Sequence, residues 1–411
     1  MTSLLIRDLA QLATPEGDSG PLRGAGLRAV RVVEDAYVLC RDGRISSVGP
    51  MADLTREMAS GVPEIDGRGL SAIPGLVDCH THACFGGDRV NEFSLRAGGA
   101  TYEELHAAGG GILSTVSATR AASEVELTQI TLLHRARMRA HGTTTFEAKS
   151  GYGLDHDTEL AQLAAIRAAG GVPTWLGAHT VPPEFTDADA YVDFLIADVL
   201  PDAAGLAEAA DVFLERGSFD KSQARRYLEA CAAAGLALRL HGDQFTESGA
   251  IDLAIDLGAR SVDHLEATGP AGVTALAASD VTGVLLPASA LFLDRPMPPA
   301  RALVDAGGLV ALATDFNPGS AYCESLPLVL SLACTQLHLA PEEALVAATV
   351  NPAHVLGRGA RIGRLAPGFN ADIVLLDATD WRHVAYHLAG DVVHAVFEGG
   401  AEVFRRTAYC S

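Results

Sequence analysis

The stretch Pro74-Gly75-Leu76-Val77-Asp78-Cys79-His80-Thr81-His82 decides the fold that we expect for this chain of 411 residues. Its apolar residues lead to two histidines that are one residue apart. In an extended strand, side chains alternate between two faces, so His80 and His82 would point the same way as Asp78. Two imidazoles on one face at the end of a buried strand form half of a metal site. A His-x-His pair also arises by chance, so the rest of the chain has to support this interpretation.

Further strand-like runs follow the histidine stretch, separated by Ala-rich segments of helical period. The runs are residues 143–149, 174–179, 211–215, 236–241, 261–264, 282–287 and 309–315. Ser123-Glu124-Val125-Glu126 and Asp220-Lys221-Ser222-Gln223 are helix start signals in two of the separating segments. Together with the first run, these units predict an α/β fold with a (β/α)8 TIM-like barrel. A doubly wound parallel sheet is the alternative.

Both ends of the chain predict short strands and turns. Asp42-Gly43 favours a tight hairpin between two strand-like runs near the start. The strand-like runs near the other end are residues 371–377, 391–397 and 402–404. We therefore expect a small β-sandwich domain built from both termini, residues 1–73 plus 358–411, beside a barrel of residues 74–357.

Composition and charge limit the classes of function and location. The formal net charge of -21 argues against nucleic acid or an anionic membrane as partner. No apolar stretch approaches the roughly 20 residues of a membrane helix, and the N-terminus lacks the features of a secretory signal. The seven cysteines are odd in number and include no Cys-x-x-Cys pair. A reduced, cytoplasmic chain with buried thiols fits this pattern better than a disulfide framework or a zinc ribbon.

Polar residues gather where the predicted barrel strands end, which is where barrel enzymes place catalytic groups. These residues are His80 and His82 on the first strand, Glu147 and Lys149 on the second, His179 on the third, His241 on the fifth, His264 on the sixth and Asp315 on the eighth. A barrel brings its strand ends around one point, so these side chains can converge. Three imidazoles and one carboxylate suit zinc or another first-row metal such as iron. We predict His80, His82, His241 and Asp315 as the ligands.

His264 is close in barrel order but is left off the metal, which makes it the natural proton shuttle. A metal ion at the site would lower the pKa of a bound water molecule and generate a hydroxide nucleophile near neutral pH. Asp315 could take the proton from that water. The residues therefore predict a metal-dependent hydrolase that acts on a polar, anionic, cyclic substrate.

This arrangement resembles the amidohydrolase superfamily and, over nearly the whole chain, its imidazolonepropionase family. The stretches that carry the resemblance are Phe85-Gly86-Gly87-Asp88-Arg89, Ala108-Gly109-Gly110-Gly111-Ile112, Lys149-Ser150-Gly151-Tyr152-Gly153, Leu176-Gly177-Ala178-His179 and residues 313–320. The resemblance implies hydrolysis of 4-imidazolone-5-propanoate to N-formimidoyl-L-glutamate with one zinc or iron ion per chain. A homodimer is common among barrel enzymes of this kind.

The same resemblance implies a set of substrate contacts. They fall on Arg89, Tyr152, His179, Gln244, Asn317, Gly319 and Ser320. Arg89 offers a planar fork for the propanoate carboxylate, although an ion pair with the adjacent Asp88 is an alternative. Tyr152 and His179 can hydrogen-bond a polar heterocycle. Lys149 has two open roles, a salt bridge inside the barrel or support of the active-site loop.

Three rival functions remain open. An aminohydrolase that deaminates a small heterocycle would have Glu three residues after the fifth-strand histidine, where this chain has Gln244. An amide can hydrogen-bond a ring nitrogen but cannot shuttle a proton, and Glu247 is a substitute. A two-metal cyclic amidase would need a carboxylated lysine, usually on the fourth strand, and residues 211–215 contain none. A non-catalytic metal-binding protein would have an incomplete set of ligands, whereas this set is complete.

Overall fold

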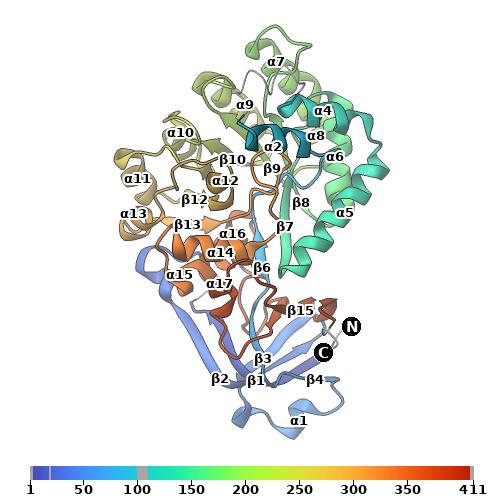
Figure 1. Ribbon diagram of the computed structural model, residues 1–411, viewed down its shortest axis with the longest axis vertical. Coiled ribbons are helices and arrows are strands. Elements are labelled where there is room, and N and C mark those ends of the chain that lie inside the picture. Colours follow the sequence, from blue (N-terminus) through green and yellow to red (C-terminus); the bar gives the residue numbers. More distant parts are fainter. Residues whose placement is uncertain (1–2, 18–19, 100–109, 408–411) are drawn as a thin grey trace.

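The computed structural model describes residues 3–17, 20–99 and 110–407. Ala108, Gly109 and Cys410 lie outside these ranges. Figure 1 shows a ring of strands surrounded by helices, with a separate sheet below it that contains both ends of the chain. This arrangement confirms the predicted α/β barrel with a β unit built from both termini, and it excludes the doubly wound sheet.

Parallel strands form the barrel in strict chain order. They are β6 (Leu76–Asp78), β7 (Thr143–Lys149), β8 (Val172–Ala178), β9 (Ala209–Leu214), β10 (Ala237–Gly242), β11 (Ser261–His264), β12 (Thr282–Leu285) and β13 (Leu309–Leu312). The residues after β6 and β13 close the ring. The Asp315 N–H donates to the His80 carbonyl (3.1 Å), and the His82 N–H donates to the Phe316 carbonyl (2.8 Å). These two hydrogen bonds bring the segments after β6 and β13, which contain three of the predicted ligands, side by side.

The predicted strand runs are all strands, but several end earlier than expected, most of all the first and the eighth. They stop at Asp78 and Leu312 rather than at His82 and Asp315. Asp315 has a φ of 54°, a left-handed conformation that a regular strand does not contain. The predicted ligands His80, His82 and Asp315 therefore lie just beyond the ladder, whereas the predicted ligand His241 lies within β10.

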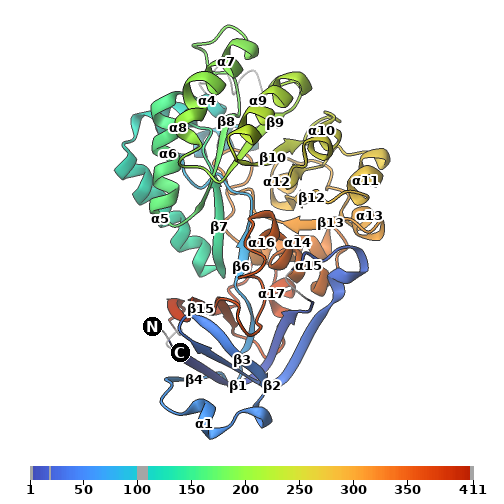
Figure 2. The same ribbon diagram turned by 180° about the vertical axis from the view of Figure 1, so that it is seen from behind.

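Helices cover the barrel on the outside (Figures 1 and 2). They are α2 (Val90–Ala97), α4 (Ile112–Ala121), α5 (Glu124–Ala140), α6 (His156–Ala168), α7 (Ala188–Phe194), α8 (Leu200–Ala203), α9 (Lys221–Ala233), α10 (Ala250–Leu257), α11 (Pro270–Ala277), α12 (Pro287–Phe292), α13 (Ala300–Asp305), α14 (Leu326–Thr335), α15 (Pro341–Ala347) and α16 (Val350–Val355). The helix starts predicted at Ser123 and Asp220 are both capping boxes, closed by Glu126 and Gln223.

The sheet of the terminal unit has the strand order β16-β15-β14-β5-β1-β2-β3, with β4 paired to β1. Its elements are β1 (Leu4–Pro15), β2 (Val30–Arg41), β3 (Arg44–Pro50), β4 (Glu64–Asp66), β5 (Ser71–Pro74), β14 (Ile373–Leu376), β15 (Val393–Glu398) and β16 (Ala401–Arg405), with the short helices α1 (Arg56–Ala59) and α17 (His383–Tyr386). The hairpin between β2 and β3 turns at Asp42 and Gly43, both at positive φ. Ile6 and Val38 share one buried core with Ile373 and Phe397, so the two ends of the chain pack together.

Gly75 joins the terminal sheet to the barrel, because β5 ends at Pro74 and β6 begins at Leu76. A Cβ on Gly75 would lie 2.2 Å from the Thr144 Oγ1, so only glycine fits against β7 here. The stretch that predicts the fold thus spans the junction of both parts, as Figure 2 shows from the opposite side. Within the described ranges, no helix is both long and apolar enough to cross a membrane. The six described cysteines are free thiols.

Candidate metal centre and active-site cavity

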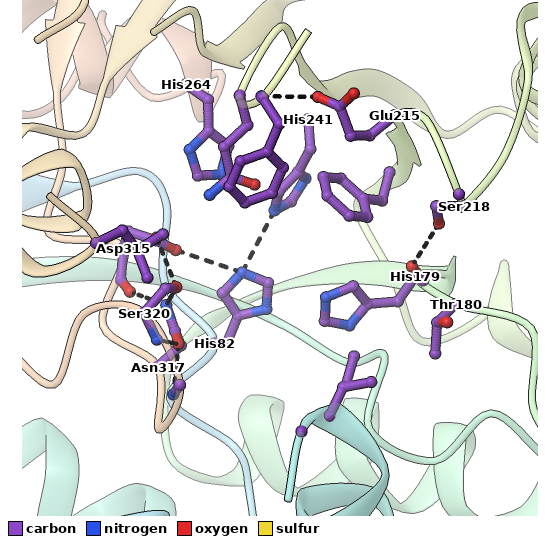
Figure 3. A pocket seen from close by; sticks show the side chains of 18 of the residues that line it. His82, His179, Thr180, Glu215, Ser218, His241, His264, Asp315, Asn317 and Ser320 are labelled. Atoms are coloured by element: carbon purple, nitrogen blue, oxygen red, sulfur yellow. Dashed lines mark hydrogen bonds and ion pairs between the residues drawn. The ribbon is translucent and has the colours of Figure 1, made fainter. Parts of the chain in front are cut away.

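Histidines from three strands and one aspartate converge beyond the C-terminal ends of the barrel strands. The His80 and His82 Nε2 atoms lie 3.5 and 3.6 Å from the Asp315 Oδ1. The His241 Nε2 lies 3.3 Å from the His82 Nε2, and Figure 3 shows these side chains directed toward one another. Among the residues that the structure describes, two groups have ligand atoms within 4.8 Å of one another: His80, His82 and Asp315, and His80, His241 and His264. The structure therefore brings the predicted ligands together and places His264 beside them.

The chemistry of these donor atoms fits a metal ion. The His80 Nε2 and the Asp315 Oδ1 are buried, and neither has a hydrogen-bond partner among the described residues. Burial lowers the pKa of His80 and His82 well below its usual value, so both imidazoles are neutral at pH 7. A neutral imidazole nitrogen and a carboxylate oxygen that lie close together without such hydrogen-bond partners are costly to bury unless a cation lies between them. The arrangement satisfies the donor requirements of a first-row metal.

Two buried carboxylates that were not predicted from the sequence hold His80 and His241 from behind. The Asp263 Oδ2 lies 2.6 Å from the His80 Nδ1, and the Asp211 Oδ1 lies 3.0 Å from the His241 Nδ1. When each Nδ1–H donates to its carboxylate, the Nε2 keeps a free lone pair that faces the centre. The place of Asp211 and Asp263 in the sequence could have indicated this role, because an aspartate inside an apolar strand is rarely buried without a partner.

His264 has a carboxylate partner of its own. Its Nδ1 lies 3.4 Å from the Glu266 Oε1. Burial opposes protonation, but the carboxylates of Glu266, Asp315 and Asp263 outweigh it and raise the pKa of His264. His264 and Leu265 also have positive φ angles of 83° and 74°, a strained backbone typical of functional sites. His264 can therefore carry a proton under conditions in which His80 and His82 cannot.

The pKa values of the predicted ligands indicate how acid would affect the candidate metal centre. Burial raises the pKa of Asp315 to about 6, whereas it lowers that of His241 to about 4. Asp315 is therefore protonated before His241 as the pH falls. We expect the Zn²⁺ affinity of the metal-free chain to decrease below about pH 6 by about tenfold per pH unit. Titration against a chelating dye from about pH 5 to about pH 8 measures this, and an affinity that stays level would contradict it.

The centre opens into a cavity of about 530 Å³, which suits a small heterocyclic ligand. Its wall contains every residue that the family resemblance assigns to the substrate: Arg89, Tyr152, His179, Gln244, Asn317, Gly319 and Ser320. Glu215, Arg216, Phe213 and Phe245 also line it and were not predicted. The strand ends thus supply both the candidate metal centre and the walls around it.

Arg89 is held in place by Glu92 and not by its neighbour Asp88. Its Nε and Nη2 donate to the two oxygens of Glu92 at 2.8 and 2.5 Å. A Cβ on Gly319 would lie 2.1 Å from the Arg89 Nη1, so the missing side chain of Gly319 leaves room for the guanidinium. The Nη1 group is therefore the part of the fork that remains for a ligand carboxylate.

His179 is positioned by a contact with the backbone, and the Tyr152 ring lies beside it with centroids 5.4 Å apart. The His179 Nδ1–H donates to the Gly151 carbonyl (2.9 Å), and the His179 ring stacks on that of His82 with centroids 5.4 Å apart. Gly151 has a φ of 99°, and a Cβ there would lie 2.7 Å from the Leu176 carbonyl oxygen. Position 151, directly before Tyr152, therefore requires glycine, because the backbone after β7 lies close to that of β8.

The loop after β13 is folded by Asn317. Its Oδ1 accepts from the N–H groups of Gly319 and Ser320 at 2.8 and 2.7 Å, and its Nδ2 donates to the Asp315 carbonyl at 2.6 Å. The Asn317 amide therefore shapes the wall beside Asp315.

Gln244 lies on a loop that Glu215 holds. The Glu215 Oε2 accepts from the N–H groups of Phe245 and Thr246 at 2.8 and 3.2 Å. Glu247, the substitute proton carrier of the deaminase alternative, is exposed and accepts from the Gly269 N–H at 2.8 Å. It is not among the described residues that line the cavity, so its position does not support that alternative.

Comparisons with known proteins agree with this geometry. A model described as "Amidohydrolase family" matches residues 71–403. An imidazolonepropionase of Rubrobacter xylanophilus is 60% identical over 407 residues, which cover 97% of this chain and 98% of the relative. An imidazolonepropionase of Chloroflexus aggregans is 46% identical over 419 residues, with 97% and 98% coverage.

Solved structures share the fold at lower identity. Escherichia coli guanine deaminase has a TM-score of 0.71 at 16% identity and covers 99% of this chain and 100% of its own. An adenosine deaminase from Xanthomonas campestris with bound zinc has a TM-score of 0.69 at 21% identity, with 98% and 92% coverage. At these identities the likeness concerns the fold alone.

Proposed function

We propose how the residues of this chain open the imidazolone ring of 4-imidazolone-5-propanoate. The chain belongs to the imidazolonepropionase family of amidohydrolases. It is a hydrolase of histidine degradation that acts on this compound. The product is N-formimidoyl-L-glutamate. The observation that carries the proposal is the convergence of buried, neutral imidazoles and Asp315 at the base of a cavity that contains Arg89.

We assign one metal ion, zinc or iron, to His80, His82, His241 and Asp315. The orphaned buried atoms of His80 and Asp315 and the carboxylates behind His80 and His241 support this set. Such an ion, when bound, lowers the pKa of a water molecule and polarises a carbonyl oxygen. His264 stays off the metal in this assignment because its pKa is raised, whereas the pKa values of His80, His82 and His241 are lowered, so His264 is the histidine suited to hold a proton.

The cavity walls orient the substrate. Arg89 binds the propanoate carboxylate through its Nη1 and thereby turns the ring carbonyl toward Asp315. Tyr152 and His179 hydrogen-bond the heterocycle, and the Gln244 amide forms a hydrogen bond with a ring nitrogen of the substrate. The loop of Asn317, Gly319 and Ser320 contacts the substrate or product beside Asp315.

Two residues handle protons. Asp315 or His264 accepts the proton of the attacking water as the bond to the ring carbonyl carbon forms. His264 then delivers a proton to the ring nitrogen that leaves, and the C–N bond breaks. The former carbonyl carbon becomes the new carboxylate of the product. Glu266 stabilises the imidazolium form of His264 between these two transfers.

A steady-state assay tests this function. Freshly prepared 4-imidazolone-5-propanoate is mixed with protein whose metal content has been counted, and the loss of its ultraviolet absorbance is followed. We expect turnover that a chelator abolishes and added metal restores. Absence of turnover in metal-loaded protein would contradict the proposal, and ammonia release from a panel of heterocycles would then test the deaminase alternative.

Arg89→Ala is expected to raise KM for 4-imidazolone-5-propanoate by about ten- to a hundredfold, because a charge-assisted hydrogen bond contributes about 1.5–3 kcal/mol. An imidazolone without the propanoate chain is the matched control, since it cannot contact Arg89 and its KM should not change. Steady-state kinetics of both compounds measure the effect. An unchanged KM for the propanoate would remove Arg89 from the carboxylate role.

A further inference from the structure

Lys149, at the end of β7, is fully buried inside the barrel next to the candidate metal centre. Its Nζ lies 2.8 Å from the Glu147 Oε1, 2.8 Å from the Asp211 Oδ2 and 3.9 Å from the Asp263 Oδ2. Burial disfavours the charge, but Asp211 and Glu147 raise the pKa of Lys149, so the ammonium stays charged. One cation therefore faces three buried carboxylates.

Two of these carboxylates connect Lys149 to metal ligands. Asp211 turns its Oδ2 to Lys149 and uses its Oδ1 to accept from both the His241 Nδ1 (3.0 Å) and the His241 N–H (3.1 Å). The Asp263 Oδ2 lies between the His80 Nδ1 (2.6 Å) and the ammonium. The orientation of both imidazoles thus depends on carboxylates whose own positions are set by Lys149.

The third carboxylate connects Lys149 to the backbone between His80 and His82. The Glu147 Oε2 accepts from the Thr81 N–H (3.0 Å), and the Thr81 hydroxyl donates to the Glu147 carbonyl (2.6 Å). The Lys149 N–H donates to the Thr81 carbonyl (2.9 Å). Thr81 is the central residue of the His-x-His stretch, so this route fixes the spacing of the two histidines.

From these contacts we infer that Lys149 is the positioning residue of the metal centre: its ammonium holds three carboxylates, which in turn fix His80, His241 and the backbone at Thr81. The inference rests on the proposed metal ligation. Without the ammonium, the carboxylates would repel one another in a medium of low dielectric and the imidazoles would lose their fixed orientation. A compact charge with three donors suits this position better than the larger planar fork of arginine.

Arg239 provides a matched control inside the same barrel. It is equally buried, and its Nη1 lies 3.1 Å from the Glu147 Oε1. Its guanidinium also donates to the carbonyls of Cys79 and Val355. Its replacement therefore removes a buried cation of the network and a contact to Glu147, but it leaves the contacts of Lys149 with Asp211 and Asp263.

The test compares the Zn²⁺ affinity of the metal-free full-length chain, measured by competition with a chelator, in wild type, Lys149→Met and Arg239→Met. We expect Lys149→Met to bind Zn²⁺ about 10- to 100-fold more weakly and Arg239→Met to lose clearly less. The visible absorption of the Co²⁺-loaded forms, which reports ligand geometry, should change in Lys149→Met only. Wild-type affinity in Lys149→Met, or an equal loss in both variants, would overturn the inference.

If Lys149→Met does not unfold cooperatively, a second variant with balanced charge is used to test the inference. Lys149→Met/Glu147→Gln removes one positive and one negative charge, so the net charge of the buried cluster stays that of wild type. We expect it to fold and still to bind Zn²⁺ more weakly than wild type, and wild-type affinity would overturn the inference. A wild-type chain that binds no Zn²⁺ would instead overturn the proposed function, which distinguishes the two failures.

Discussion

Replacing His264 by alanine is expected to lower kcat by about two to four orders of magnitude while the chain keeps its metal ion. The imidazole is the only part removed, and Glu266 holds it in an orientation suited to proton transfer. The proton of the attacking water and the proton of the leaving nitrogen would then have to move through solvent. Turnover of 4-imidazolone-5-propanoate, together with metal analysis of the same sample, measures both quantities.

Glu266→Gln separates proton transfer by His264 from a role as ligand. The Glu266 carboxylate contributes to the raised pKa of His264, so its loss should lower that pKa. If neutral His264 is the base, the acid limb of kcat should move to lower pH in Glu266→Gln. Loss of the metal in His264→Ala would contradict the role of proton carrier and would identify His264 as a ligand. This outcome is a real alternative, because a ring nitrogen of His264 lies within 4.8 Å of those of His80 and His241.

The fold could be predicted because each local signal agreed with the barrel. The strand limits of β7 and β11 are those predicted, and the helix starts at Ser123 and Asp220 are real capping boxes. Local chemistry decides such features. The ends of β6 and β13 could not be placed from the sequence, because closure of the ring and the left-handed backbone of Asp315 depend on contacts between segments far apart in the chain.

The candidate site was predicted only in part, for a similar reason. Position at strand ends identified the predicted ligand residues that the structure brings together, since a barrel brings all its strand ends together. Asp211 and Asp263 were missed because the sequence does not tell which residues of a short strand face inward. The partner of Arg89 was also missed: Glu92 lies three residues further along α2, where the helix turns it back toward the guanidinium. The two open roles of Lys149 are distinguished by its burial among carboxylates.

Asp315→Asn is expected to lower turnover by about three orders of magnitude or more, because it weakens metal binding and the chemistry of the ion contributes several kcal/mol. Asparagine keeps the size of the side chain and loses the negative charge. Chelator treatment of wild type should cause a loss of similar size that added Zn²⁺ reverses, whereas Asp315→Asn should remain inactive at the same Zn²⁺ concentration. Full activity of Asp315→Asn would remove this residue from the set of ligands.

The free energy of unfolding of the metal-free chain should increase in Asp315→Asn, although its turnover decreases. This combination is expected of a metal ligand. Burial raises the pKa of Asp315 to about 6, above that of an unfolded aspartate, so its ionised form destabilises the metal-free fold above pH 6. Metal-free Asp315→Asn at about pH 7.5 should therefore be more stable than metal-free wild type, by up to about 3 kcal/mol. Zn²⁺ at about 1,000 times its Kd for wild type should reverse the order, because a ligand at that excess adds about 4.1 kcal/mol to the folded wild type, which exceeds this difference. Denaturant unfolding of both chains, with and without Zn²⁺, measures these differences. A structural aspartate would instead leave the variant less stable under both conditions.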